Sequence, residues 1–210
     1  MKHFFITGTD TDCGKTYVTA HLVNYFSYAA AIKPLATGCI LQEDQLISSD
    51  ALQLQKNNNL SLEQINPWRF KLPVSPHIAA KEENTFISAT EIANYCLNFE
   101  LKGVERLFIE GAGGILVPLN DEETWIDFLK ITHFPVILVV GMKLGCINHA
   151  LLTEAVLRVH DIPCVGWIAN CMDPDMVALL ANIDTLKSKL QVPLLATLPF
   201  RGVFSEVRKF

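Results

Sequence analysis

The chain has 210 residues and a formal net charge of −5, and its composition is 50% hydrophobic and 19% charged. This balance is typical of a globular protein, excludes a disordered chain, and suffices for one α/β domain with a sizeable core. The negative charge, with no basic run, argues against nucleic acid or an anionic membrane surface as the main partner.

The cysteines and the apolar runs indicate where the protein works. The six cysteines form neither a CxxC pair nor a Cys/His zinc spacing, so we expect free thiols in a reducing cytoplasm. No signal peptide precedes the apolar run Phe4-Phe5-Ile6. The longest strongly apolar stretch, Phe134 to Met142, is far shorter than a membrane span. The sequence therefore predicts a cytoplasmic protein without a membrane partner.

Short apolar runs alternate with stretches at helical spacing along the chain. In chain order we expect strand His3–Thr7, helix Lys15–Phe26, strand Ala30–Lys33, an irregular region from Leu35 to Pro76, a helix after the capping-box pattern Ser88-Ala-Thr-Glu91, strands Val104–Ile109 and Val136–Val140, helix Ile147–Val159, strand Val165–Ala169, a helix opened by Asp173-Pro174, and strand Pro193–Thr197. The repeated strand–helix–strand order predicts a doubly wound, mostly parallel α/β sheet with right-handed crossovers, forming a single domain over residues 1–210.

Side-chain patterns support these elements. Strand Val136–Val140 is apolar at every position, as expected for a parallel strand that is covered on both faces. The polar, Asn- and Gln-rich region 35–76 is expected to be a long functional loop with a short helix. Three helices carry apolar rows: Val18, Leu22 and Phe26; Ile147, Leu151, Ala155 and Val159; and Met176, Leu180, Ile183 and Leu190, the last row expected to face inward.

A phosphate-binding loop is predicted at Gly8-Thr-Asp-Thr-Asp-Cys-Gly-Lys-Thr16, between the first strand and the first helix. Phosphates there would meet backbone N–H groups and the positive end of a helix dipole. Gly14 would permit close approach, Lys15 would reach the β- and γ-phosphates, and the Thr16 hydroxyl suits Mg²⁺. Five residues separate the outer glycines where the usual motif has four, and the alternative is a Gly-Lys-Thr tripeptide that merely begins a helix. The flanking strand and amphipathic helix favour nucleotide binding and a fold of the P-loop NTPase type.

Three further polar residues follow predicted strands or open a helix. Lys33 could neutralise a transferring phosphoryl group or an anionic substrate, although a solvated surface lysine fits equally well. Asp50 is expected at a helix start, where simple N-capping is the alternative. Glu110 is expected to close the strand before Gly111-Ala-Gly-Gly114, in the position of a Walker-B-like acid. Oxygen atoms of Thr16, Asp50 and Glu110 would suit Mg²⁺.

The ordered set of motifs resembles the dethiobiotin synthetase family, whose members close the ureido ring during biotin synthesis. The matching segments are residues 8–16, Lys33-Pro-Leu-Ala-Thr-Gly38, Ser49-Asp50-Ala51, Ser75-Pro-His-Ile-Ala79, Glu110-Gly-Ala-Gly-Gly114, Gly145-Cys-Ile-Asn-His149 and Gly166-Trp-Ile-Ala-Asn170. The resemblance implies ATP and Mg²⁺ as cofactors and 7,8-diaminononanoate with CO₂ or bicarbonate as substrates. An amine would form a carbamate, the carbamate would attack the γ-phosphate to form a carbamic–phosphoric anhydride, and the second amine would close the ring.

The resemblance also implies residue roles. Lys15, Lys33 and Thr11 would be catalytic, while Thr16, Asp50 and Glu110 would hold Mg²⁺. ATP would contact Asp12, Cys13, Gly14, Lys15, Thr16, Tyr17, Asn170, Leu198 and Pro199. The diamine would contact Thr11, Asp12, Lys33, Thr37 and Gly111, together with Gly145, Cys146, Ile147 and Asn148 at a helix start in the second subunit of a homodimer. The chain departs from the family at Asp12, where Glu is commoner, and at Cys171, where an acidic residue is common.

Three other functions remain to be weighed. A switch or partitioning ATPase would carry a signature lysine four positions before Gly14, where this chain has Asp10. An amide-forming synthetase related to cobyrinate amidation would need a glutamine-hydrolysing domain, for which 210 residues leave no room. A binding module without catalysis would leave Lys15, Lys33, Asp50 and Glu110 unexplained.

Overall fold

The computed structural model describes residues 1–210 and is built around one six-stranded parallel sheet with the order β10-β9-β8-β1-β7-β2. The strands of this sheet are β1 (Lys2–Gly8), β2 (Ala29–Ile32), β7 (Arg106–Gly114), β8 (Val136–Gly141), β9 (Cys164–Asn170) and β10 (Leu194–Leu198). Every neighbouring pair is parallel. The six predicted strands and the doubly wound α/β class are confirmed.

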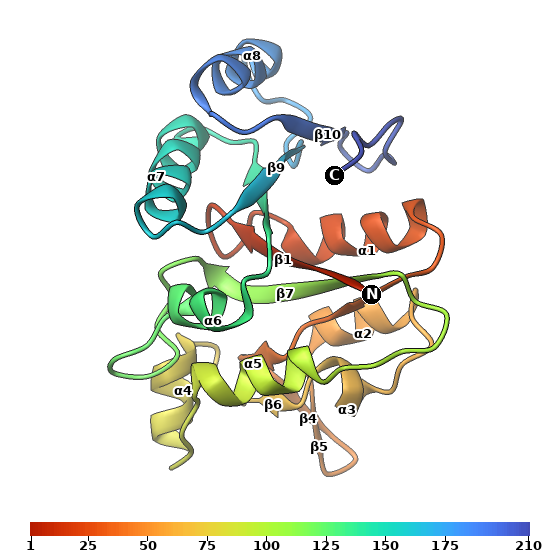
Figure 1. Cartoon of the computed structure of the whole chain (residues 1–210), viewed down its shortest axis with the longest axis vertical. Helices are drawn as coiled ribbons and strands as arrows, with labels where there is room; N and C mark the ends of the chain where they lie inside the picture. The colour runs from red at the N-terminus through yellow and green to blue at the C-terminus, as the bar shows by residue number, and fades with distance from the viewer.

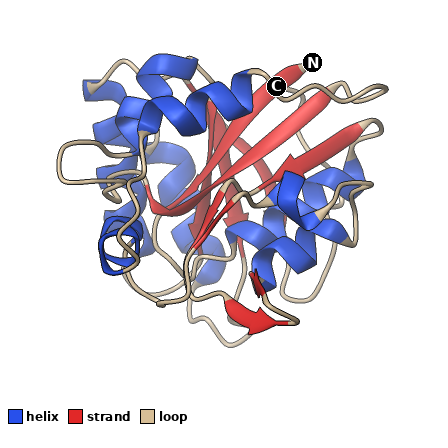
Figure 2. Ribbon diagram, turned by 90° about the horizontal axis from the view of Figure 1, so that it is seen from below, coloured by secondary structure: helices blue, strands red, loops and turns tan.

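Helices cover both faces of this sheet (Figures 1 and 2). The main ones are α1 (Lys15–Tyr25), α5 (Ala89–Leu97), α6 (Trp125–Thr132), α7 (Cys146–Val159) and α8 (Leu179–Lys189). Successive strand residues point to opposite faces, so Phe5 of β1 packs on α6 while Phe4 packs on the other face, against Phe108 and Phe210. A smaller buried cluster joins α7 and α8 to β8 and β9. No helix has the length and apolar character needed to cross a membrane.

The region between Leu35 and Pro76 is more ordered than the predicted loop with one short helix. It contains β3 (Leu35–Ala36), β4 (Ile40–Gln42), β5 (Gln45–Ile47), α2 (Ser49–Gln55), α3 (Leu62–Ile65) and β6 (Trp68–Arg69), and α4 (Pro76–Glu82) follows. The polar composition concealed this order because several polar side chains satisfy the backbone. The buried amide of Asn66 donates to the carbonyls of Lys33, Pro34 and Trp68, and Ser61 with Gln64 closes a capping box on α3.

The observed helices differ from the predicted ones in two places. No helix was predicted at α6, which Thr124 and Asp127 open through a capping box. The last helix begins at Leu179 rather than at Asp173-Pro174, because Asp173 accepts from the Asp175 N–H within a turn of its own. Leu180, which was expected to face inward, is 74% exposed, while Ile183 and Leu190 are buried as predicted.

The predicted helix at Ile147–Val159 exists as α7, but a different row of residues is buried. The buried row is Cys146, Ala150, Glu154 and Leu157, so the row that begins at Ile147 lies beside the core rather than in it. Glu154 occupies the buried row because its carboxylate accepts from the backbone N–H groups of Gln191 and Val192. The Glu154 carboxylate can therefore occupy a buried position, because these hydrogen bonds stabilise its charge.

Candidate functional site

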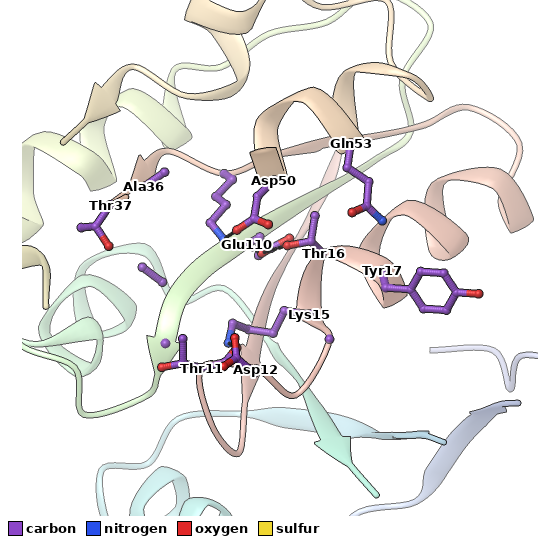
Figure 3. Close-up of a pocket in the computed structure, with 14 residues that line it drawn as sticks. Thr11, Asp12, Lys15, Thr16, Tyr17, Ala36, Thr37, Asp50, Gln53 and Glu110 are labelled. Carbon is purple, nitrogen blue, oxygen red and sulfur yellow. Dashed lines mark hydrogen bonds and ion pairs between the residues drawn. The ribbon is translucent and has the colours of Figure 1, made fainter. Parts of the chain in front are cut away.

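A cavity of about 360 Å³ lies at the carboxyl ends of β1 and β7, where the structure brings the predicted segments together (Figure 3). Parallel α/β sheets bind ligands at this edge. The lining residues are Thr11, Asp12, Gly14, Lys15, Thr16, Tyr17, Lys33, Ala36, Thr37, Asp50, Gln53, Glu110, Ala112 and Gly113. Segments separated by as many as 100 residues therefore form one polar wall.

The phosphate loop connects β1 to α1. Gly14 has a φ of 81°, and a Cβ at this position would collide with the amide of Asn170, so only glycine fits. The side chain of Lys15 turns back over the loop, and its Nζ donates to the carbonyls of Asp10 (2.9 Å) and Thr11 (3.1 Å). The loop thus has an open helix start and a buried ammonium group, which together suit an anion.

Lys33 is buried between two carboxylates, which excludes a solvated surface lysine. Its Nζ pairs with Asp50, and with Glu110 Oε1 at 2.9 Å. Thr16 Oγ1 donates to the same Glu110 oxygen at 2.6 Å. Ser48 caps α2, so Asp50 lies in the first turn and its carboxylate is free to face Lys33. The alternative that Asp50 merely caps the helix is thereby excluded.

The position of Glu110 differs from the prediction. β7 continues from Arg106 to Gly114, so Glu110 lies inside the strand rather than at its end. Its side chain is fully buried. The register explains the difference, because Gly114 of β7 still pairs with Gly8 of β1. The glycine-rich segment was interpreted as a loop, but it extends the sheet to the edge of the cavity.

Charges in this cluster stabilise one another. Burial by itself would lower the pKa of Lys33, but the carboxylates of Glu110 and Asp50 hold it above its ordinary value. Burial would likewise raise the pKa of Asp50, but the Lys33 ammonium keeps it below 3.8. The lysine therefore remains charged and Asp50 remains ionised at neutral pH.

The donor set fits Mg²⁺. Two carboxylates and one hydroxyl converge from α1, α2 and β7, and Glu110 Oε2 is buried without any hydrogen-bond partner. Such hard oxygen ligands, few in number, match a cation that keeps several waters and substrate phosphates. No group of three or more His, Cys, Asp or Glu side chains gathers to form a transition-metal site.

The predicted substrate residues fall into two groups. Thr11, Asp12, Lys33 and Thr37 line the cavity. Gly111 lies in β7, where a Cβ would collide with the ring of Phe5, and its neighbours Ala112 and Gly113 line the cavity instead. Gly145, Cys146, Ile147 and Asn148 lie at the start of α7 and do not line this cavity within one chain.

The residues expected at the nucleotide base lie on the other side of the phosphate loop. Asn170 ends β9, and its buried amide donates to the carbonyl of Cys13 at 2.9 Å. Leu198 ends β10, where its carbonyl accepts from the Cys171 N–H, and Pro199 follows. The Tyr17 hydroxyl donates to the Gly202 carbonyl at 3.3 Å, which connects α1 to this edge.

Sequence reasoning missed two contributors. Gln53 lines the cavity one helical turn after Asp50, and its amide has no hydrogen bond within the chain (Figure 3). The spacing of three residues from Asp50 on a helix could have identified it. Lys143, which pairs with Asp10 of the loop at 2.7 Å, had no such signal because 133 residues separate the two.

Comparison with solved structures finds the same fold in other proteins. The MinC:MinD cell division complex of Aquifex aeolicus matches with a TM-score of 0.55 at 14% identity, covering 95% of this chain and 81% of that chain. A ParA family ATPase from Chlorobium tepidum matches with a TM-score of 0.55 at 14% identity, covering 94% of this chain and 83% of its own. At this identity the likeness concerns the fold alone.

Comparison with known sequences is more specific. Residues 2–208 match the family described as "AAA domain". The ATP-dependent dethiobiotin synthetase BioD of Legionella pneumophila strain Paris is 61% identical over 207 residues, covering 99% of this chain and 98% of the relative. The protein of the same name from Pseudoalteromonas translucida is 44% identical over 206 residues, covering 95% and 91%. The chain therefore belongs to the family of ATP-dependent dethiobiotin synthetases.

Proposed function

We propose that this protein converts 7,8-diaminononanoate and CO₂ to dethiobiotin with the hydrolysis of ATP, a ring-closing ligase reaction of biotin biosynthesis. The observation that carries the proposal is the single cavity in which the ammonium groups of Lys15 and Lys33 meet Thr16, Asp50 and Glu110. Such a cavity suits a phosphoryl group that passes between two negatively charged reactants, and the family membership supplies the substrates.

The reaction proceeds through three bond changes. One amine of the diamine attacks CO₂, loses a proton and becomes a carbamate. A carbamate oxygen attacks the γ-phosphorus, and the bond from that phosphorus to the oxygen of ADP breaks. The second amine then attacks the carbamate carbon, the bond to the phosphate oxygen breaks, and the ring closes with release of phosphate and a proton.

The chain supports these changes mainly by position and charge. Lys15 leaves the carbonyls of Asp10 and Thr11 to donate to the terminal phosphates. Lys33 faces the carbamate and the transferring phosphoryl group, and Thr11, Asp12 and Thr37 orient the diamine. Thr16, Asp50 and Glu110 would hold Mg²⁺, which supplies charge neutralisation at the β- and γ-phosphates. Asn170, Leu198 and Pro199 border the base.

The second subunit belongs to the proposal as well. Leu144, next to the start of α7, is 99% exposed, and α7 carries further exposed apolar residues at Leu152 and Val159. These features support a homodimer in which Gly145–Asn148 of a neighbouring copy bind the substrate carboxylate through backbone N–H groups. We also propose that residues 1–210 act as one domain and that the enzyme works in the cytoplasm, in keeping with its free thiols.

The experiment that tests the function follows phosphate release from ATP with Mg²⁺ and bicarbonate, with and without the diamine, while mass spectrometry detects dethiobiotin. We expect release that depends on the diamine and matches dethiobiotin in amount. ATP turnover that ignores the diamine would overturn the synthetase proposal. It would favour the switch ATPase, despite Asp10 at the position of the signature lysine.

A further inference from the structure

Two side chains from distant parts of the sequence are bonded to the phosphate loop. Lys143 follows the end of β8, and Asn170 is the last residue of β9. Each contacts a different half of the loop, Lys143 at Asp10 and Asn170 at Cys13. Both contacts lie on the side of the loop away from Asp50 and Glu110, because β8 and β9 succeed β1 in the sheet in the direction opposite to β7.

The contact at Lys143 shapes the first half of the loop. Asp10 uses both carboxylate oxygens, since Oδ2 accepts from Lys143 Nζ at 2.7 Å and Oδ1 accepts from the Thr11 N–H at 2.7 Å. The backbone carbonyls of the same two residues hold the ammonium of Lys15. The hydrogen bond from Lys143 also lowers the pKa of Asp10, and the bond to Asp10 raises that of Lys143. One ion pair therefore orients the stretch of backbone on which Lys15 rests.

The contact at Asn170 fixes the second half. Its amide donates to the Cys13 carbonyl at 2.9 Å, and both residues are buried. The same amide packs against Gly14, where a Cβ would collide with it. Asn170 thus fits closely against the peptide that presents its N–H groups to a phosphate.

We propose that Lys143 and Asn170 are positioning residues that hold the phosphate loop in its ligand-binding shape before the nucleotide arrives. The loop has five residues between its outer glycines, and Thr11 and Asp12 are exposed, so ordering it during binding would cost conformational entropy. Tethers that order it in the free protein reduce that cost and raise affinity. For Asn170 this role is separate from the contact with the base that the family resemblance implies. The inference rests on the proposed function only in requiring that the loop bind a triphosphate.

Inorganic tripolyphosphate separates the two roles of Asn170 because it has no base. Its affinity in the presence of Mg²⁺ is measured by calorimetry for the wild type, Asn170→Ala and Lys143→Met. We expect about five- to tenfold weaker binding in each variant, the range that corresponds to one lost hydrogen bond. Asn182→Ala and Lys187→Met, which lose comparable surface contacts on α8, should bind like the wild type. If Asn170→Ala binds tripolyphosphate as tightly as the wild type does, Asn170 has no positioning role and can act only by contacting the base.

A double-mutant cycle tests whether Lys143 acts through Asp10 rather than on the phosphate itself. If Lys143 positions the loop, Asp10→Asn should weaken tripolyphosphate binding as much as Lys143→Met, and the double variant should be no weaker than either. If Lys143 binds phosphate directly, Asp10→Asn should leave binding intact or strengthen it, which would overturn the proposal. Lys143→Arg should restore most of the affinity.

Further measurements distinguish a folding defect, a loss of loop positioning and a wrong proposed function. Circular dichroism and thermal melting of each variant show whether it folds, and Lys143→Arg remains informative if Lys143→Met does not. At saturating ATP, phosphate release with the diamine should persist in Lys143→Met while the KM for ATP rises. A wild type that binds tripolyphosphate but makes no dethiobiotin would refute the proposed function without affecting the positioning role of Lys143 and Asn170. Variants that bind tripolyphosphate as tightly as the wild type does would refute the positioning role alone.

Discussion

At the scale of single residues, the site depends on a buried ammonium group shared by two carboxylates. Lys33 pairs with Asp50 and with the fully buried Glu110, and the Thr16 hydroxyl completes the cluster. Desolvation of such groups is costly, so removing one partner of a buried pair destabilises more than the pair itself contributes. The carboxylates that suit Mg²⁺ are also the partners of Lys33, so we expect Mg²⁺ and the Lys33 ammonium to compete for Asp50 and Glu110.

Replacing Lys33 by methionine should separate these effects. Diamine-dependent phosphate release should fall by about a hundredfold or more, because a donor to the developing charge is lost. Binding of Mn²⁺ to the nucleotide-free protein, followed by electron paramagnetic resonance, should become tighter because the competing cation is gone. Lys81→Met, at an exposed lysine with a loose contact to Asp121, is the matched control and should change neither quantity. Weaker Mn²⁺ binding in Lys33→Met would contradict the competition.

The same variant has a consequence for the dependence of stability on pH. In the folded wild type the pKa of Asp50 lies below its ordinary 3.8, so its contribution is present above that pH and is lost as the pH falls through the folded value. Lys33→Met removes the cation that lowers this pKa and leaves burial, which raises it. As the pH falls from about 5 to about 3, the free energy of unfolding in urea should therefore drop less in the variant than in the wild type. Parallel pH profiles for the two proteins would contradict the assignment.

At the scale of elements, a helix that contributes no side chain to the cavity supports its wall. Trp125 begins α6, and its fully buried indole donates from Nε1 to the carbonyl of Ala112 at 3.0 Å. Its ring also packs on Phe5 of β1. Since Ala112 and Gly113 line the cavity, α6 fixes the glycine-rich end of β7 from behind.

Trp125→Phe keeps an aromatic ring and removes the donor. The Ala112 carbonyl would lose its donor in a buried setting, which we expect to lower the free energy of unfolding by about 1–3 kcal/mol in urea titrations. The KM for the diamine should rise as well, because the cavity wall loses a support. Trp68→Phe, at a half-buried tryptophan whose indole makes no hydrogen bond within the chain, should cost less. Equal losses in both variants would mean that ring size alone matters.

At the scale of the whole molecule, residues 204–210, which follow the edge strand β10, pack on α1 and on the core of the sheet. Phe204 packs near His21 and Tyr25 of α1, and Phe210 packs on Phe4 and Phe26. The Tyr25 hydroxyl accepts from the Val207 N–H at 3.2 Å. Two apolar side chains of the stretch Ser205–Phe210, those of Val207 and Phe210, pack on the core.

Phe204→Ala should therefore destabilise the whole fold. Phe204 is 7% exposed, and truncating a buried phenylalanine costs about 3–5 kcal/mol. Phe200→Ala provides a matched control, because Phe200 is 41% exposed and lies only four residues earlier. Urea denaturation at neutral pH measures both. A loss in Phe204→Ala no greater than in Phe200→Ala would show that the C-terminal stretch is not part of the core.

The proposed homodimer predicts that the exposed face of α7 is covered by a second copy. Leu152, together with Val156, borders a cavity of about 280 Å³ against Ile115 and Leu116. Leu152→Glu should shift sedimentation from dimer to monomer and raise the KM for the diamine, since a buried charge would oppose association. Val177→Glu, at a residue before α8 that is 87% exposed, should do neither. A wild type that sediments as a monomer would refute the proposal.

The sequence by itself determined the features that are local. The alternation of apolar runs and helical spacing predicted all six strands of the parallel sheet. This was possible because the apolar residues of each strand indicate by themselves that the strand is buried. The position of the loop between β1 and α1 could be predicted for the same reason, since Gly8, Gly14, Lys15 and Thr16 lie in one short segment. Thr16, Asp50 and Glu110 could be grouped because all three carry side-chain oxygen atoms of the kind that suits Mg²⁺.

Only the tertiary structure decided which distant groups touch. Lys33 and Glu110 are 77 residues apart, Lys143 and Asp10 are 133 apart, and Asn170 and Cys13 are 157 apart. Local propensity does not predict such pairs, because they form only when strand order and crossovers bring the ends of different strands together. The order within residues 35–76 was not predicted for the same reason. Asparagine is typical of loops, and only the folded structure shows that the Asn66 amide donates to buried backbone carbonyls.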